Sequence, residues 1–147
     1  MLTLPPCGVL TKGVFDCATT QPALFDAAID ADMSGLVAAS DTQTLALLVW
    51  ACAKSSYAAP ALFDAVAARL MGSRDLLASA DHQHLSNVLW SFATAGVASE
   101  PLFRTISQEL LARRDSVFSC QHVANIAWAC ATAGVSPPGL LDWLARQ

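Results

Sequence analysis

The stretch DHQHLSNVLWSFATAG, from Asp81 to Gly96, decides the fold because near-copies of it occur on both sides in the sequence. DTQTLALLVWACAKSS runs from Asp41 to Ser56, and SCQHVANIAWACATAG runs from Ser119 to Gly134. The copies align without a gap, so their tryptophans recur at intervals of 40 and 38 residues, at Trp50, Trp90 and Trp128. Internal periods of this size are typical of stacked supersecondary units.

Each copy has the apolar periodicity of an α-helix. Projected at 100° per residue, positions five and two before the tryptophan and two after it share one face, which is expected to pack inside the unit. The residues four before and three after the tryptophan are small, as at Ala46 and Ala53, and leave room for a neighbouring helix beside the indole. Asp41, Asp81 and Ser119 stand where an N-cap is expected, and Gly96 and Gly134 suit a left-handed C-terminal cap.

A second motif marks a partner helix in each unit. It consists of a Leu-Phe pair at residues 24–25, 62–63 and 102–103, and of Leu140-Leu141 in the last copy. Each pair follows a proline that suits a first helical turn, at Pro22, Pro60, Pro101 or Pro138. The segments 34–40, 72–80 and 112–118 are then predicted to be connections between helices.

The sequence therefore predicts an all-α chain that forms a short α-solenoid of helix pairs. One domain is expected over residues 21–147, with units at about 22–59, 60–99 and 100–136 and a partial unit at 137–147. Residues 1–20 are less regular and are either an irregular segment or a decayed unit. The predicted repeat core consists of Trp50, Trp90, Trp128, Phe25, Phe63 and Phe103.

Composition agrees with a globular chain. Of the 147 residues, 54% are apolar and 14% are charged, and no apolar run reaches the roughly 18 residues that a membrane-spanning helix needs. The five cysteines are odd in number and lack CxxC spacing, which favours buried free thiols in a reducing compartment. No targeting peptide is visible, and the formal net charge is −4.

The phrase Q-x-[LV]-[AS]-[LN]-[LVI]-x-W-[AS]-[CF]-A-[KT], together with the proline-led Leu-Phe helix, resembles the octotricopeptide repeat from roughly Pro22 to Gln147. Repeats in organellar proteins with RAP or FAST-kinase-like regions are similar. The resemblance implies a right-handed superhelix without enzymatic activity. It also implies RNA binding in chloroplasts or mitochondria, in transcript maturation, stability, translation or ribosome assembly.

A narrow stripe of mostly uncharged hydrogen-bonding residues beside each tryptophan is the main candidate for RNA contact, because helical repeats read bases with a few side chains. The stripe consists of Gln43, Gln83, Gln121, Asn87, Asn125, Lys54, Thr94 and Thr132. The alternative is that these residues cap or link neighbouring helices, and the identity of the three glutamines favours it. Positions that vary between units are better specificity candidates. They are Lys54, Thr94 and Thr132 in the stripe, and Thr44, His84 and His122 on or beside the same face.

Arginines are candidates for phosphate contact. Arg104, Arg113 and Arg114 in one unit, with Arg69 and Arg74 in the unit before, either bind phosphates or complement helix ends in solvent.

The histidines and Cys120 do not predict a metal site. His82 and His84 are two residues apart and point about 200° apart on a helix, so they cannot chelate together. No glycine-rich phosphate loop or nucleophile motif is present in the sequence, and neither an enzyme nor a cofactor is expected.

The last helix is predicted to present an uncovered apolar face made of Leu140, Leu141, Trp143 and Leu144, and this face predicts a protein partner. That face and the acidic charge favour a second hypothesis, in which the chain is a scaffold or accessory subunit of a large organellar complex. Examples are a mitochondrial ribosome and a photosynthetic complex. The resemblance favours the first hypothesis, RNA binding.

Overall fold

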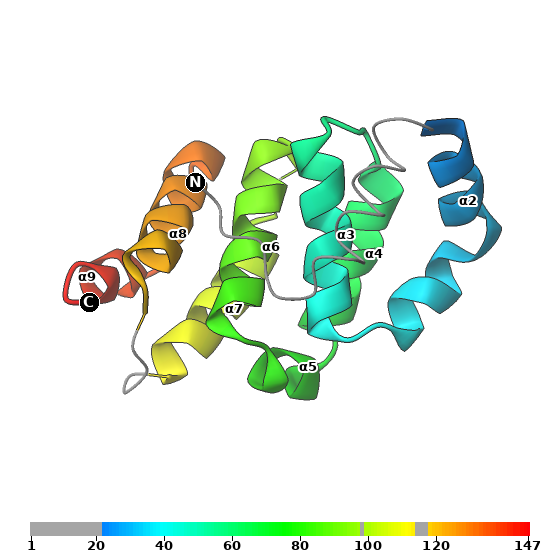
Figure 1. The fold of residues 1–147 in the computed structure, drawn as a ribbon. Helices are drawn as coiled ribbons and strands as arrows, with labels where there is room; N and C mark the ends of the chain where they lie inside the picture. The colour runs from blue at the N-terminus through cyan, green and yellow to red at the C-terminus, as the bar shows by residue number, and fades with distance from the viewer. Residues whose placement is uncertain (1–21, 98, 114–117) are drawn as a thin grey trace.

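The computed structural model describes residues 22–97, 99–113 and 118–147, and within these ranges every regular element is an α-helix (Figure 1). The prediction of an all-α fold is confirmed for this part of the chain. In order, the helices are α2 (Pro22–Ala39), α3 (Thr42–Lys54), α4 (Pro60–Met71), α5 (Arg74–Ser79), α6 (His82–Thr94), α7 (Glu100–Ala112), α8 (Cys120–Ala133) and α9 (Leu140–Leu144).

The three tryptophan helices lie side by side in one layer. Figure 1 shows α3, α6 and α8 running in the same direction, with α4 and α7 behind them. The most extensive contacts in the structure join α3 to α6 and α6 to α8. At the two ends, α2 packs mainly against α4, and α9 packs against α7 and α8. The central tryptophan helix, α6, therefore lies between the other two tryptophan helices, α3 and α8.

The predicted N-caps are confirmed, which explains why the tryptophan helices start in register. The Asp41 carboxylate accepts from the Thr44 N–H at 2.8 Å, and the Ser119 hydroxyl accepts from the His122 N–H at 3.2 Å. Asp81 accepts from the N–H of Gln83 at 3.2 Å. Each bond satisfies a first-turn donor that has no partner inside the helix.

The three tryptophan helices end with the same backbone turn. Gly96 and Gly134 have φ values of 69° and 66°, which confirms the left-handed conformation predicted for both. Ser56, at the equivalent place in the first copy, has a φ of 56°. Since an L side chain is disfavoured there, the serine adopts a strained version of a turn that glycine forms easily.

The aromatic core lies between the two layers. Phe63 and Phe103 are buried, and the Phe63 ring meets the Phe92 ring edge-on with centroids 4.9 Å apart. The tryptophans lie at the helix–helix seams instead: Trp50 and Trp90 are half-buried, and Trp128 is 46% exposed. Phe63 and Phe103 therefore lie in the core, and the tryptophans lie at contacts between neighbouring helices, where the small residues beside them predicted that a helix would approach. The side chain of Phe25 lies outside the described residues.

Two of the predicted connections are wrong. Residues 34–39 belong to α2, which has a kink at Asp32, where the carboxylate accepts from the Gly35 N–H at 2.9 Å and restarts the helix. Residues 74–79 form α5, with the Ser73 hydroxyl as N-cap for the Leu76 N–H. The third connection is described only at residues 112, 113 and 118, and 112 is the last residue of α7.

The expected uncovered face on the last helix is also wrong for most of its residues. Leu140, Trp143 and Leu144 are buried, and the Phe118 ring lies edge-on to Trp143 with centroids 4.8 Å apart. Leu141 is the exception, at 43% exposed. The helix also starts at Leu140 and ends at Leu144, so Pro138 is not in its first turn and the helix covers only part of the unit predicted at 137–147. None of the helices in the described ranges is both long and apolar enough to cross a membrane.

Candidate functional site

A polar cavity of about 200 Å³ lies between α6 and α8. Its lining consists of Gln83, Asn87, Ser119, Gln121, His122 and Asn125. Five of these were candidates from the sequence, and they come from two different units that the fold brings together. The sequence did not predict that Ser119 lines the cavity. Its position as N-cap of α8 places it at the start of the helix, two residues before the stripe residue Gln121.

The lining offers hydrogen bonds without charge. Four of the six residues carry amides, which donate and accept, and Asn87 is buried. Burial lowers the pKa of His122 below its usual value of 6.5, with Asp81 opposing the shift, so the ring is neutral at pH 7. The His122 Nδ1 atom is buried and has no hydrogen-bond partner. A buried polar atom without a partner is uncommon, and this one belongs to a residue that lines the cavity.

His84 occupies the position on α6 that His122 occupies on α8, but its ring is engaged. Its Nδ1 accepts from the Asp81 N–H at 3.4 Å and completes a capping box. Burial lowers its pKa, and the carboxylates of Asp81 and Asp41 oppose that shift. Of the two equivalent histidines, therefore, His122 is the one with an uncommitted ring nitrogen.

The junction between α3 and α6 has a different composition. Leu47 stands where α6 and α8 carry Asn87 and Asn125. Gln43 is half-buried there and Thr44 is exposed. The amide pair that lines the α6–α8 cavity therefore has no counterpart on α3.

The remaining stripe residues lie at the far ends of the same helices. Lys54, Thr94 and Thr132 are exposed in the last turns of α3, α6 and α8. Gln83 and Thr94 are eleven residues apart, so about 16 Å of helix separates the cavity from this end. Lys54 is also the only lysine or arginine in the sequences of α3, α6 and α8.

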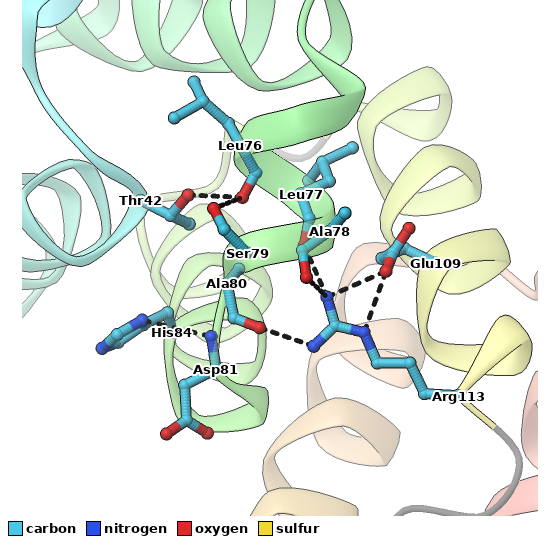
Figure 2. Close-up of polar contacts among 10 residues, drawn as sticks. All are labelled: Thr42, Leu76, Leu77, Ala78, Ser79, Ala80, Asp81, His84, Glu109 and Arg113. Carbon is cyan, nitrogen blue, oxygen red and sulfur yellow. Dashed lines mark hydrogen bonds and ion pairs between the residues drawn. The ribbon is translucent and has the colours of Figure 1, made fainter.

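Arg113 does not belong to this surface. Figure 2 shows its guanidinium donating to the carbonyls of Leu77, Ala78 and Ala80, at the C-terminal end of α5, and to the Glu109 carboxylate. The side chain is only 15% exposed. Its donors already bind the chain itself, which disfavours the phosphate contact predicted for this residue.

The other arginines lie away from the cavity. Arg104 is on α7, in the second layer, where it forms a solvent-exposed ion pair with Glu100 at 2.7 Å. Arg69 is half-buried on α4 and has a buried Nε atom without a partner. Arg74 is the first residue of α5, not part of a last turn as the sequence suggested, and Arg114 lies outside the described residues.

Thiols and histidines do not gather into a reactive site. Cys52 and Cys130 are buried free thiols, as predicted, and burial raises the pKa of Cys52 to about 11. Cys120 is free but exposed. The His82 ring stacks on Phe118 with centroids 4.0 Å apart. In the described part of the chain, no three His, Cys, Asp or Glu side chains come together as a metal site would require.

The cavity thus presents neutral donors and acceptors from α6 and α8, and the sequences of α3, α6 and α8 hold one basic side chain, that of Lys54. Comparisons with protein-family models, with curated proteins and with solved structures each returned no match. Neutral amides arranged in this way suit a ligand with its own amide-like or heteroaromatic edges.

Proposed function

We propose that this chain is a non-catalytic binding module that binds single-stranded RNA along α3, α6 and α8. In this proposal the helix pairs are octotricopeptide-like units with a period of 38 to 40 residues, stacked as a right-handed solenoid. The resemblance of the sequence supports a role in organellar gene expression, in a chloroplast or a mitochondrion. The observation that carries the proposal is the polar cavity between α6 and α8.

The chemistry of that cavity favours bases over phosphates. Amide side chains pair with base edges, because both present donors and acceptors in one plane. The neutral His122 ring and the Ser119 hydroxyl add further hydrogen-bonding groups without adding charge. Single-stranded RNA exposes base edges that a duplex hides, so it is the form of nucleic acid that such a cavity can reach.

Phosphate contacts contribute little in this mode of binding. Arg113 binds the carbonyls of α5. Lys54 is the one lysine or arginine in the sequences of α3, α6 and α8. One phosphate contact on a single strand gives a slope of about −0.7 in a plot of log affinity against log salt concentration. We therefore expect weak RNA binding with a shallow salt dependence.

The test measures binding of a pool of short single-stranded RNAs of randomised sequence by fluorescence anisotropy. Asn87→Leu and Asn125→Leu place in α6 and α8 the residue that α3 carries naturally as Leu47. Each is expected to weaken binding by about tenfold, the value of one good base contact. Gln108→Leu, at an exposed position on α7, serves as the control and should bind as the unaltered protein does. An affinity that both asparagine variants leave unchanged would reject the proposal.

Protein binding is the second candidate function. The net charge of −4 and the single basic residue on the stripe favour it, because RNA-binding surfaces are usually basic. In that case the chain acts as a scaffold or accessory subunit of a large organellar assembly, such as a mitochondrial ribosome or a photosynthetic complex. Failure of the RNA pool to bind at low salt, where electrostatic attraction is strongest, would favour this second function.

A further inference from the structure

The helix–helix seams inside the chain show how a tryptophan helix covers its neighbour. On α3, the small residues beside Trp50 are Ala46 and Ala53, and they are 1% and 5% exposed. Their equivalents on α6 are Ser86 and Ala93, which are 0% and 6% exposed. Because α6 lies against α3 and α8 lies against α6, each seam is closed by the next helix in the layer.

The same seam on α8 is open. Ala124 and Ala131 hold the equivalent positions and are both exposed, and Trp128 between them is 46% exposed. One side of its indole lies near Trp90, with ring centroids 6.3 Å apart, so the ring is held in place at this end of the layer. The seam is built like the two closed ones and lacks only a covering helix.

A residue on α9 repeats this pattern. Leu141 stands at the place of Phe63 and Phe103, both buried, yet it is 43% exposed. Phe63 is buried in part by Phe92, which comes from the next tryptophan helix. Leu141 and the α8 seam therefore lack the same kind of neighbour, a further tryptophan helix.

The chemistry of α8 favours a second copy of this chain as the occupant. Residues 120–133 contain no aspartate, glutamate, lysine or arginine, so two copies of α8 approach without charge repulsion or buried unpaired charge. A bulky indole flanked by two alanines is also self-complementary, because under a twofold axis each indole lies over the alanines of the other copy. Head-to-tail stacking on α3 is disfavoured, since Ala51, which corresponds to the buried Ala129 of α8, is already only 1% exposed.

We propose that two copies of this chain associate through α8, with Trp128 of each copy packed against Ala124 and Ala131 of the other and with Leu141 at the edge. The face is small and apolar, so the dimer is a weak one that forms by burying the two indoles. The polar cavity lies on the other side of α8, toward α6, so this association is independent of RNA binding.

Sedimentation equilibrium of the 147-residue protein, from about 1 µM to about 100 µM, tests the proposal over the range in which a small interface dissociates. The mass should rise from 15.4 kDa toward twice that value. Ala124→Glu and Ala131→Glu each place a charge in the interface and should weaken association by at least about tenfold. Ala68→Glu changes another exposed helical alanine, on α4, and should leave the dimer intact.

All three alanines are exposed, so the variants should fold, and circular dichroism checks that they do. A mass of one chain at every concentration would overturn the proposal, as would a dimer that survives both α8 substitutions. Growth beyond two chains would equally overturn it, because twofold pairing closes the assembly.

Discussion

Replacing Arg113 by alanine should destabilise the fold far more than replacing Arg104. Arg104 lies on α7 and Arg113 directly follows this helix, and each pairs with a glutamate four residues earlier. Arg104 makes only that exposed pair, and such pairs contribute about 0.5 kcal/mol. Arg113 in addition donates to the last carbonyls of α5, as Figure 2 shows.

The size of the effect follows from those additional bonds. A hydrogen bond from a charged group contributes about 1.5 kcal/mol or more, and Arg113 makes two close ones, to Leu77 and Ala80. Both acceptor residues are buried, so water replaces the lost donor poorly. We therefore expect Arg113→Ala to lower the free energy of unfolding by about 3 kcal/mol.

Urea unfolding followed by circular dichroism measures both variants. Equal losses for Arg113→Ala and Arg104→Ala would refute the reasoning, because they would mean that the carbonyl contacts add nothing. Glu109→Ala provides a further control, since it removes the ion pair and leaves the carbonyl contacts in place. Its loss should be clearly smaller than that of Arg113→Ala, because the bonds to the carbonyls of α5 remain.

Three further predictions concern stability. Gly96→Ala should lower the free energy of unfolding by about 1 kcal/mol, because the backbone there is left-handed even though a Cβ would meet no atom within 4 Å. Ser56→Gly should raise the free energy of unfolding by about 0.5 kcal/mol, because glycine adopts the left-handed conformation easily. Urea midpoints that move in the opposite directions would contradict both predictions. Thr42→Val removes the hydrogen bond that the Thr42 hydroxyl donates to the Leu76 carbonyl at 2.7 Å. The free energy of unfolding, measured by thermal unfolding, should fall by about 1 kcal/mol. An unchanged free energy of unfolding would mean that this bond is not formed in solution. Burial lowers the pKa of all three histidines in the folded chain, so the unfolded chain binds protons first as the pH falls. The free energy of unfolding should therefore be highest above about pH 6.5 and should decrease as the pH drops below that value. Unfolding curves that coincide at pH 7.5 and pH 5.5 would exclude this linkage.

Local capping chemistry explains what the sequence predicts well. Asp41, Asp81 and Ser119 are short hydrogen-bonding residues placed just before an apolar periodicity, and each caps a helix in the structure. Gly96 and Gly134 follow the same helices and adopt the expected left-handed turn. Such signals depend on a few neighbouring residues, so they can be read without knowing the rest of the fold.

The features that the sequence did not predict depend on distant contacts. Helix α5 has six residues, too few to be stable alone, and it is held by Arg113 and Thr42 from other parts of the chain. The role of Arg113 follows the same pattern, because its partners lie 33 to 36 positions away. Burial of Trp143 also depends on a distant ring, that of Phe118.

The candidate site was predictable in its residue types but not in its grouping. The periodicity placed Gln83, Asn87, Gln121 and Asn125 on corresponding faces of two helices. Only the structure shows that the cavity lies between those helices and that His122 and His84 differ in their partners. That difference arises from side-chain geometry around two similar N-caps, which the repeated sequence does not distinguish.

The position of α6 between α3 and α8 has a consequence for amide hydrogen exchange. Opening α6 breaks two seams at once, whereas opening α8 breaks one, so the two helices differ in their free energy of local opening. Backbone protons of α6 should therefore exchange with deuterium more slowly than those of α8, although the two helices are copies of one repeated motif.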